Sequence, residues 1–496
     1  MKPLLISVYG FASIALFIYG LNAYLMIALY FKGRKKFKEQ SLELVEFQEE
    51  DCPVVTTQVP LYNEANVAER VMRAVAAMDY PQDKHEIQIV DDSNDETREI
   101  TNNVADELRA KGYRIEVIHR ENRDGYKAGA LKEAMAVCAG EFIAIFDGDF
   151  LPPKNFLKKS VALLLRKEKV CLVQGRWGHI NQNASLFTEA QSIGIDGHFV
   201  IEQTARTYTG LFMNFNGTAG VWRKAAIIDA GNWQADTLTE DLDLSYRAQL
   251  KGWECLYLPD LIVPGEIPES VEAFKSQQFR WAKGSIQTAI KMFPRVLSSE
   301  VSLFKKVQAY FHLTHYLIHP LMLTVSLLAL PMLHYSNYKI PTLLMVLLVG
   351  LLSLAVSAPN ILYIVSQSAV YKDWYKRIFY LPMLMFIGVG IAASNTKAVF
   401  EAVVGIKSGF VRTPKKGDAV IRKYRIKTPT LCVVELFLGG YSFYSGYNYY
   451  LADKQMVVPF LMLYAVGFTF IGLSGLKLAI RRRGESPNLV VADPVL

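Results

Sequence analysis

The chain has 496 residues, of which 51% are apolar, and its formal net charge is +7. This length is too great for one soluble domain, and this apolar fraction is too high for two average ones. The composition therefore excludes one soluble domain or two of average composition, and the apolar excess is localised in particular segments. The basic residues cluster beside long apolar segments, so the positive charge is explained without a nucleic-acid partner.

The first apolar segment predicts a membrane anchor. Residues 3–31 contain no charged side chain, and the basic cluster Lys32–Lys38 follows at once. About 20 apolar residues span a bilayer. A cleaved signal peptide has a shorter apolar region and a small-residue cleavage site, which this segment lacks. We therefore expect residues 1–38 to form an N-terminal transmembrane anchor.

Between the anchor and residue 300, short apolar runs alternate with helical patterns. The runs expected to form buried strands are residues 54–59, 86–90, 114–118, 141–146 and 170–174. The helical patterns cover residues 65–78, 97–111, 127–138 and 154–166. This alternation is typical of a mostly parallel sheet with right-handed crossovers. In such sheets, ligands bind beyond the carboxyl ends of the strands.

Three polar or acidic clusters fall at these strand ends. They are Tyr62-Asn63-Glu64 after the first expected strand, Asp91-Asp92 after the second, and Asp147-Gly148-Asp149 after the fourth. An isolated aspartate in this place is usually a helix cap, but three clusters exceed what the fold requires. The clusters therefore predict a ligand site at this edge of the sheet.

Two kinds of chemistry use acids placed in this way. A phospho-receiver has an acidic pair and an acceptor aspartate on a later strand, as Asp92 and Asp147 are placed, but it also needs a lysine after a further strand. No lysine occurs from residue 170 to residue 223, and Asp149 has no role in that scheme. A nucleotide-sugar site uses both aspartates of the turn, because two carboxylates can hold Mg²⁺ or Mn²⁺ against a diphosphate. The pattern favours this second chemistry.

A further acidic cluster lies in residues 237–243. Thr237 and Glu240 match a capping box, and acids suit a helix N-terminus, so a helix start explains the cluster structurally. A general base at the same helix start explains it functionally, and the two readings are compatible. The spacing does not choose between Glu240, Asp241 and Asp243.

Residues 276–285 predict an amphipathic helix with an unusual polar face. At about 100° per residue, Gln277, Arg280, Trp281 and Gly284 fall in one narrow sector. An apolar stripe that includes Phe279 lies on roughly the opposite side. Trp281 therefore belongs with the polar side chains and is not needed for the core.

Apolar segments return after residue 300. Four of them are typical of membrane spans: residues 307–338, 340–371, 431–451 and 456–476. A further segment, 379–406, carries Lys397 and Glu401. The basic clusters 32–38, 372–377, 412–427 and 481–483 should all face the cytoplasm, and a crossing at 379–406 would separate them. We therefore expect 379–406 to be interfacial or re-entrant, with five spans in all and the N-terminus outside.

Polar side chains inside these spans predict a path for a polar ligand. His312, His315 and His319 share one helix face, but no nearby acid or cysteine completes a metal site. We expect them to line the entrance of an acceptor path, and Glu435 to contact sugar.

In order, these motifs resemble those of membrane-embedded family 2 glycosyltransferases of the cellulose synthase superfamily. Asp91-Asp92, Asp147-Gly148-Asp149, Thr239-Glu240-Asp241 and Gln277-x-x-Arg280-Trp281 match the D, DxD, TED and QxxRW pattern. The stretches VQGRWGHIN (173–181) and NGTAGVWR (216–223) look like the glucomannan 4-β-mannosyltransferase and xyloglucan-backbone synthase branch. FVRTPK (410–415) is similar to the gating-loop motif FxVTxK, with Arg412 in place of its valine. The resemblance covers residues 52–480.

The resemblance implies an α/β GT-A fold, a single inverting displacement and a β-linked product. The donor-binding residues that it implies are Tyr62, Glu64, Asp92, Lys127, Asp147, Asp149 and Arg280, of which Asp147 and Asp149 would bind Mg²⁺ or Mn²⁺. It makes Asp241 the general base and places Trp281, Gln277 and Glu240 at the acceptor. Gly284 would leave room for the ligand. Inversion needs one base, whereas retention needs a second carboxylate beside the anomeric carbon.

The expected organisation follows the chain. Its parts are an N-terminal anchor (1–38), a cytosolic GT-A domain (50–268), an interfacial helix with QxxRW (269–300), two transmembrane helices (307–371), the interfacial or re-entrant helix (379–406), a cytosolic gating-type loop (407–428), two more transmembrane helices (431–480) and a cytosolic tail (481–496). The expected location is a bacterial plasma membrane or the Golgi.

Three functions are consistent with this organisation. The first is synthesis and translocation of a β-1,4-linked polysaccharide from UDP-glucose or GDP-mannose. The second is transfer of one sugar to a membrane lipid such as diacylglycerol or ceramide. The third, a non-enzymatic transporter with a nucleotide-sensing domain, leaves the complete motif set unexplained. Five spans and the FVRTPK segment favour the first, and the motifs do not distinguish the donor's base or sugar.

Overall fold

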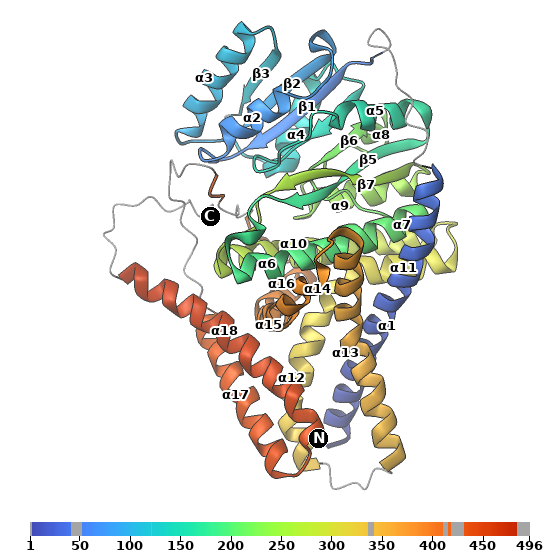
Figure 1. Ribbon diagram of the computed structural model, residues 1–496, viewed down its shortest axis with the longest axis vertical. Coiled ribbons are helices and arrows are strands. Elements are labelled where there is room, and N and C mark those ends of the chain that lie inside the picture. The colour runs from blue at the N-terminus through green and yellow to red at the C-terminus, as the bar shows by residue number, and fades with distance from the viewer. Residues whose placement is uncertain are drawn as a thin grey trace.

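Figure 1 shows the computed structural model, in which a sheet domain at the top of the view adjoins a bundle of long helices. The structure describes residues 2–40, 52–120, 122–335, 342–409, 415–417 and 431–483. Most of the gating-type loop 407–428 and the tail from residue 484 lie outside these ranges.

The sheet domain is built on seven strands. They are β1 (Val55–Leu61), β2 (His85–Asp91), β3 (Arg114–His119), β4 (Phe142–Ile145), β5 (Val170–His179), β6 (Gly220–Arg223) and β7 (Glu254–Gly265). Their order is β3-β2-β1-β4-β6-β5-β7, and all neighbours are parallel except the pairs that β6 makes with β4 and β5. The mostly parallel sheet predicted from the sequence is therefore confirmed.

Two strands, β6 and β7, were not among those expected. β6 has only four residues, too few for hydrophobic periodicity to show. It enters the sheet antiparallel between β4 and β5, which breaks the strand-helix alternation. Its Trp222 side chain is fully buried, so the strand is fixed by packing rather than by local pattern.

Helices cover both faces of the sheet (Figure 1). The elements of this domain are α2 (Ala68–Ala76), η2 (Gln82–Lys84), α3 (Thr97–Ala110), α4 (Tyr126–Val137), α5 (Phe156–Arg166), η3 (Gln182–Ala184), α6 (Leu186–Asp196), the π-helical η4 (Gly197–Gln203), α7 (Thr204–Tyr208), α8 (Lys224–Asp229) and α9 (Glu240–Leu250). Phe142 and Ile143, successive on β4, belong to different buried clusters, as the two-residue period of a strand requires. The sheet is thus buried on both faces, which is typical of parallel sheets.

The remaining helices form the bundle. They are α1 (Lys2–Gln40), α10 (Val271–Ser298), α11 (Leu303–Thr314), η5 (His315–Leu317), α12 (Ile318–Tyr335), α13 (Thr342–Val370), α14 (Trp374–Arg377), η6 (Ile378–Tyr380), α15 (Leu381–Gly390), α16 (Ala392–Val404), α17 (Cys432–Leu451), η7 (Gln455–Val457) and α18 (Val458–Arg483).

Within the described ranges, three helical stretches are long and apolar enough to cross a membrane: Pro3–Glu39, Leu303–His334 and Gln455–Ile480. The segment expected at 379–406 is bent, since Trp374–Gly390 and Ala392–Val404 are inclined by 42°, as in a broken span or a re-entrant loop. That α13 and α17 also cross, and with them the five-span topology, stays a prediction.

The helix α10 ties the sheet domain to the bundle. Its N-terminus is capped by Ser270, whose hydroxyl accepts a hydrogen bond from the Ala273 N–H. Lys275 Nζ lies 2.5 Å from Glu435 Oε1 on α17, and Lys283 Nζ lies 2.7 Å from Glu401 Oε2 on α16. Glu435, expected to contact sugar, is therefore already paired with a lysine. Two ion pairs fix this helix against the bundle.

Gly284 of α10 has a different role from the one expected. A Cβ atom at this position would lie 2.6 Å from Thr239 Cγ2 and 2.9 Å from the Leu238 carbonyl carbon. The missing side chain therefore admits the segment that precedes α9, not a ligand. The expectation that Gly284 leaves room for the ligand is wrong, because the sequence did not show which segment lies against this face.

Candidate active site

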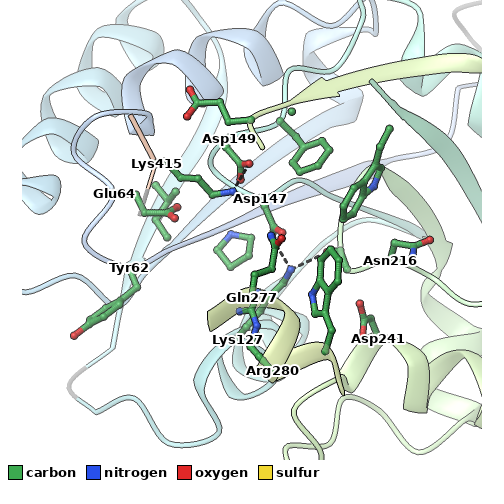
Figure 2. Close-up of a pocket in the computed structure, with 18 of the residues that line it drawn as sticks. Tyr62, Glu64, Lys127, Asp147, Asp149, Asn216, Asp241, Gln277, Arg280 and Lys415 are labelled. Atoms are coloured by element: carbon green, nitrogen blue, oxygen red, sulfur yellow. Dashed lines mark hydrogen bonds and ion pairs between the residues drawn. The ribbon is translucent and has the colours of Figure 1, made fainter. Parts of the chain in front are cut away.

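A pocket opens beyond the carboxyl ends of the parallel strands, with α10 on one side (Figure 2). All eleven residues assigned to the donor, the metal, the base or the acceptor line it: Tyr62, Glu64, Asp92, Lys127, Asp147, Asp149, Glu240, Asp241, Gln277, Arg280 and Trp281. The structure brings them together from six separate stretches of the chain. Their individual roles stay predictions.

The first aspartate of the turn after β4 is paired with a lysine. Lys127 Nζ on α4 lies 2.5 Å from Asp147 Oδ1 and also donates to the Gly217 carbonyl oxygen at 2.8 Å. Burial lowers the pKa of Lys127, but Asp147 and Glu240 outweigh it and the net pKa is raised. Lys127 therefore carries a positive charge beside these acids in the pocket.

The second aspartate of the turn is paired as well, with a residue that sequence reasoning did not single out. Lys415 Nζ lies 2.5 Å from Asp149 Oδ2, and both side chains are largely buried. Burial raises the pKa of Asp149, and Lys415 offsets part of that rise. The FVRTPK segment ends on this lysine, whereas its residues 410–414 lie outside the described ranges.

The two aspartates fit a divalent cation. Asp147 and Asp149 offer hard carboxylate oxygens, and each already binds an ammonium group. Mg²⁺ is usually held by one or two carboxylates together with substrate phosphates. Among the described residues, no group of three or more His, Cys, Asp or Glu side chains could hold a metal. The site therefore suits a cation that arrives with a diphosphate and takes its remaining ligands from it.

Two arginines that the sequence did not single out organise another part of the pocket. Arg120 binds Asp92 through two hydrogen bonds, with Nε 2.7 Å from Oδ1 and Nη2 2.5 Å from Oδ2. The Arg123 guanidinium lies 3.2 Å from the centre of the Tyr62 ring. Tyr62 and Arg123 thus stack at the wall of the pocket, and Arg120 fixes the orientation of the Asp92 carboxylate.

Three acids lie in the first turn of α9, and two of them, Glu240 and Asp241, line the pocket. Asp241 lines the pocket, and its Oδ1 accepts the Leu242 N–H at 2.8 Å. Burial and the neighbouring Glu240 raise the pKa of Asp241 to about 7. Asp243 is fully buried and pairs with Arg247 and Lys291, at 2.8 and 2.9 Å. Asp243 is therefore excluded as the general base, which leaves Glu240 and Asp241 of the three residues that the spacing allowed.

The capping box expected at the start of α9 does not form. The N-cap residue is Thr239, whose side chain makes no capping hydrogen bond and instead lies 3.1 Å from the Thr288 hydroxyl. The Thr237 hydroxyl is buried without a hydrogen-bond partner among the described residues. The prediction of a helix start was confirmed, but the helix is held from outside, by α10, rather than by its own cap.

The side of the pocket next to Trp281 is aromatic. Trp281 and Trp177 have ring centres 6.5 Å apart, inclined by 54°, and Trp177 stacks on Phe199 at 4.8 Å. Trp177 and Asn216 line the pocket but were not predicted to. Trp177 lies near the carboxyl end of β5, and this position in the sequence could have predicted that it lines the pocket.

The three histidines expected to line an acceptor path are bonded within the protein. His312 lies 2.8 Å from the Tyr246 hydroxyl and 3.0 Å from Asn214 Oδ1. His319 lies 2.9 Å from Asn395 Nδ2, and none of the three histidines lines the pocket described above. His312 thus connects α11 to α9, and His319 connects α12 to α16.

Comparison with known proteins agrees with this geometry. The profile described as glycosyltransferase like family 2 matches residues 53–284. Glucomannan 4-β-mannosyltransferase 7 of Arabidopsis thaliana is 32% identical over 457 residues, which cover 89% of this chain and 80% of the relative. The chain therefore belongs to the family 2 glycosyltransferases and is a hexosyltransferase.

Within that family, its relatives are glucomannan 4-β-mannosyltransferases. Glucomannan 4-β-mannosyltransferase 1 of Oryza sativa subsp. japonica is 39% identical over 265 residues, which cover 52% of this chain and 51% of the relative. A mannosyltransferase from Pyrobaculum calidifontis, solved in complex with GDP-Man and Mn²⁺, superposes with a TM-score of 0.54 over 81% of this chain and 100% of its own, at 19% identity. That likeness shows a shared fold, and the GT-A class predicted from the motifs is confirmed. With its apolar helices, the chain is an integral membrane protein.

Proposed function

We propose that the chain transfers a hexosyl group from a nucleoside diphosphate hexose to the end of a β-1,4-linked polysaccharide. The observation that carries this proposal is the meeting of Asp241, the Asp147–Asp149 turn and Trp281 in one pocket. A base, an anion-binding turn and a sugar-stacking ring are the parts that such a transfer needs. The names of the relatives make GDP-mannose the first donor to test and UDP-glucose the second.

Asp241 acts as the general base in this proposal. It takes the proton from the acceptor hydroxyl while that oxygen bonds to the anomeric carbon and the bond to the diphosphate breaks. Attack from the face opposite the leaving group gives inversion, which requires one base and no enzyme nucleophile. A pKa of about 7 suits this task, because a base is most effective near the operating pH.

Positive groups stabilise the leaving diphosphate. Lys127 and Arg280 line the pocket, and fixed charges in a water-poor site stabilise developing charge more strongly than they do in water. Asp147 and Asp149 would hold Mg²⁺ or Mn²⁺, which neutralises further charge on the diphosphate when bound. The nucleoside lies at Tyr62, Glu64 and Asp92.

The acceptor sugar lies against Trp281, with Gln277 and Glu240 within reach of its hydroxyls. The catalytic domain faces the cytosol, where nucleotide sugars are made, and the product leaves through the chain's own spans. The basic clusters beside the apolar segments support this orientation.

The test supplies membranes containing the full chain with labelled GDP-mannose or UDP-glucose and Mn²⁺ or Mg²⁺. Products are separated into polymer and lipid extract, and membranes with Asp241→Asn serve as the control. Polymer that a β-mannanase or a β-1,4-glucanase degrades is the expected result. Label found only in the lipid extract contradicts the polymer proposal and supports transfer to a lipid such as diacylglycerol or ceramide.

A further inference from the structure

On the acceptor side, a hydrogen-bonded chain leads to the pocket from the π-helical segment η4. His198 Nδ1 lies 2.9 Å from Glu202 Oε2, and His198 Nε2 lies 3.1 Å from Asn216 Nδ2. Gln203 Nε2 donates to Asn216 Oδ1 at 2.6 Å. Asn216 lines the pocket, and Figure 2 shows it on the same side as Asp241, away from Asp149.

These bonds fix the orientation of the Asn216 amide. The Glu202 carboxylate accepts a hydrogen bond from the N–H at His198 Nδ1, so Nε2 keeps its lone pair and accepts a hydrogen bond from an N–H of Asn216. Burial raises the pKa of Glu202, but His198, Arg206 and His315 together outweigh it and lower the pKa to about 2, which keeps the carboxylate ionised. Gln203 is fully buried and also donates to the Asn214 carbonyl oxygen at 2.8 Å, so it cannot turn freely.

The amide of Asn216 keeps bonding capacity for a ligand. An asparagine side chain has two N–H donors and two acceptor lone pairs. One donor is committed to His198 and one lone pair to Gln203. One N–H and one lone pair remain, and a sugar hydroxyl, which both donates and accepts, matches them.

The helical segment η4, which carries His198 and Glu202, has an unusual π-helical conformation. π-Helical turns are rare and occur frequently at functional sites. Here the π-helical turn carries both His198 and Glu202, and its first residue, Gly197, lies against Tyr363 of α13. A Cβ at Gly197 would be 2.8 Å from that ring, so η4 packs tightly on the bundle.

We propose that Asn216 binds a hydroxyl of the acceptor hexose and that Glu202 and His198 are positioning residues that orient its amide. This inference rests on the proposed function and extends it to the acceptor. Trp177 and Trp281 flank the same side of the pocket. The tryptophans would therefore hold the ring of the acceptor sugar, and Asn216 would hold one of its hydroxyl groups. The reactive hydroxyl is thereby directed toward Asp241.

The test measures kinetics of the purified full chain in nanodiscs, with mannohexaose or cellohexaose as the acceptor. Asn216→Ala and His198→Ala should raise the acceptor KM about tenfold, the size of one hydrogen bond, and leave the donor KM unchanged. Glu202→Gln should retain the wild-type acceptor KM, because its amide oxygen can still accept from His198. Glu202→Leu should raise it.

The matched control is Asn214→Ala. Asn214 lies two residues before Asn216 in the chain but does not line the pocket. The change to alanine removes its 3.0 Å contact with His312. It should lower the thermal midpoint without changing the acceptor KM. A folded Asn216→Ala protein with an unchanged acceptor KM, or with donor and acceptor KM raised equally, overturns the inference.

Acceptor binding, followed by quenching of tryptophan fluorescence, separates this inference from the proposed function. If the wild type binds a hexaose but transfers nothing, the proposed function fails alone. If Asn216→Ala binds the hexaose as tightly as the wild type, the inference fails alone. Weaker binding by Asn216→Ala supports the inference whether or not transfer is seen.

Discussion

Lys415 Nζ lies 2.5 Å from Asp149 Oδ2, although 266 positions of the chain separate the two residues. The Lys415 carbonyl oxygen accepts from Asn66 Nδ2 at 3.2 Å, and Glu266 accepts the N–H groups of Lys416 and Gly417. The segment 415–417 is thus fastened to the pocket wall. Its ammonium group occupies the place where a cation is expected at Asp149.

The first prediction concerns competition for Asp149. Lys415→Met removes the ammonium but keeps the length of the side chain, so Mn²⁺ should bind about tenfold more tightly, equivalent to about 1.4 kcal/mol. Mn²⁺ binding is measured at pH 8 by electron paramagnetic resonance, without donor. Lys416→Met is the control, because the Lys416 side chain is 62% exposed and pairs with Glu269 instead. Equal affinities in the wild type and Lys415→Met contradict the competition.

The second prediction separates binding from chemistry at Asp241. Asp241→Asn should abolish transfer and retain donor binding, because the amide cannot take the acceptor's proton. Since burial and Glu240 raise the pKa of Asp241 to about 7, its ionised form opposes folding at pH 8, and the variant should have a higher thermal midpoint there. Calorimetry and donor binding are measured on the same sample, and retained turnover refutes the role as base.

The third prediction is a pH profile. The active form of Asp241 is the carboxylate, which predominates above its pKa of about 7. kcat/KM for the acceptor should therefore fall about tenfold per pH unit below pH 7 and level off above it. Initial rates at saturating donor from pH 5 to pH 9 give the profile. A flat profile through pH 6 would show that another group sets the rate.

The fourth prediction concerns the contact between α10 and the start of α9. Gly284→Ala places a methyl group against Thr239 and Leu238 and should lower kcat, because Asp241 follows directly. Overpacking of this kind costs about 1–3 kcal/mol of stability. Gly440→Ala on α17, where a Cβ meets no atom within 4 Å, is the control and should leave both kcat and the thermal midpoint near wild type.

The fifth prediction concerns the ion pair between α10 and α17. Lys275→Met leaves the buried Glu435 carboxylate without its partner, and breaking a buried pair costs about 3–5 kcal/mol. The thermal midpoint should fall strongly, and Lys275→Met with Glu435→Leu should recover most of the loss. A double variant as unstable as the single one would show that the cost arises from packing and not from charge.

The elements with a strong local pattern could be predicted from the sequence. β1 and β2 are short runs that contain several β-branched residues, and the acids after β2 and β4 fall at the strand ends where the parallel order places them. Helical spacing alone separated Trp281 from the apolar stripe, and the structure places Trp281 at the pocket.

The rest depends on contacts between distant parts of the chain. Nothing near Lys415 indicates that it meets Asp149, and the partner of Gly284 is a segment some 45 residues earlier. Likewise, the orientation of Asn216 depends on hydrogen bonds with His198 and Gln203 on η4, and no local sequence pattern predicts this π-helical turn. Such residues are found by tertiary contacts rather than by periodicity.

One side of the pocket is formed by α10, which packs on the helical bundle. Gln277, Arg280 and Trp281 stand on α10, the helix that Lys275 and Lys283 join to α17 and α16. A fragment that ends before residue 271 keeps the complete sheet but loses these three side chains. Lipid or detergent that shifts α16 and α17 will therefore also shift α10 and change the turnover rate. The activity of the enzyme should thus depend on the composition of the surrounding bilayer.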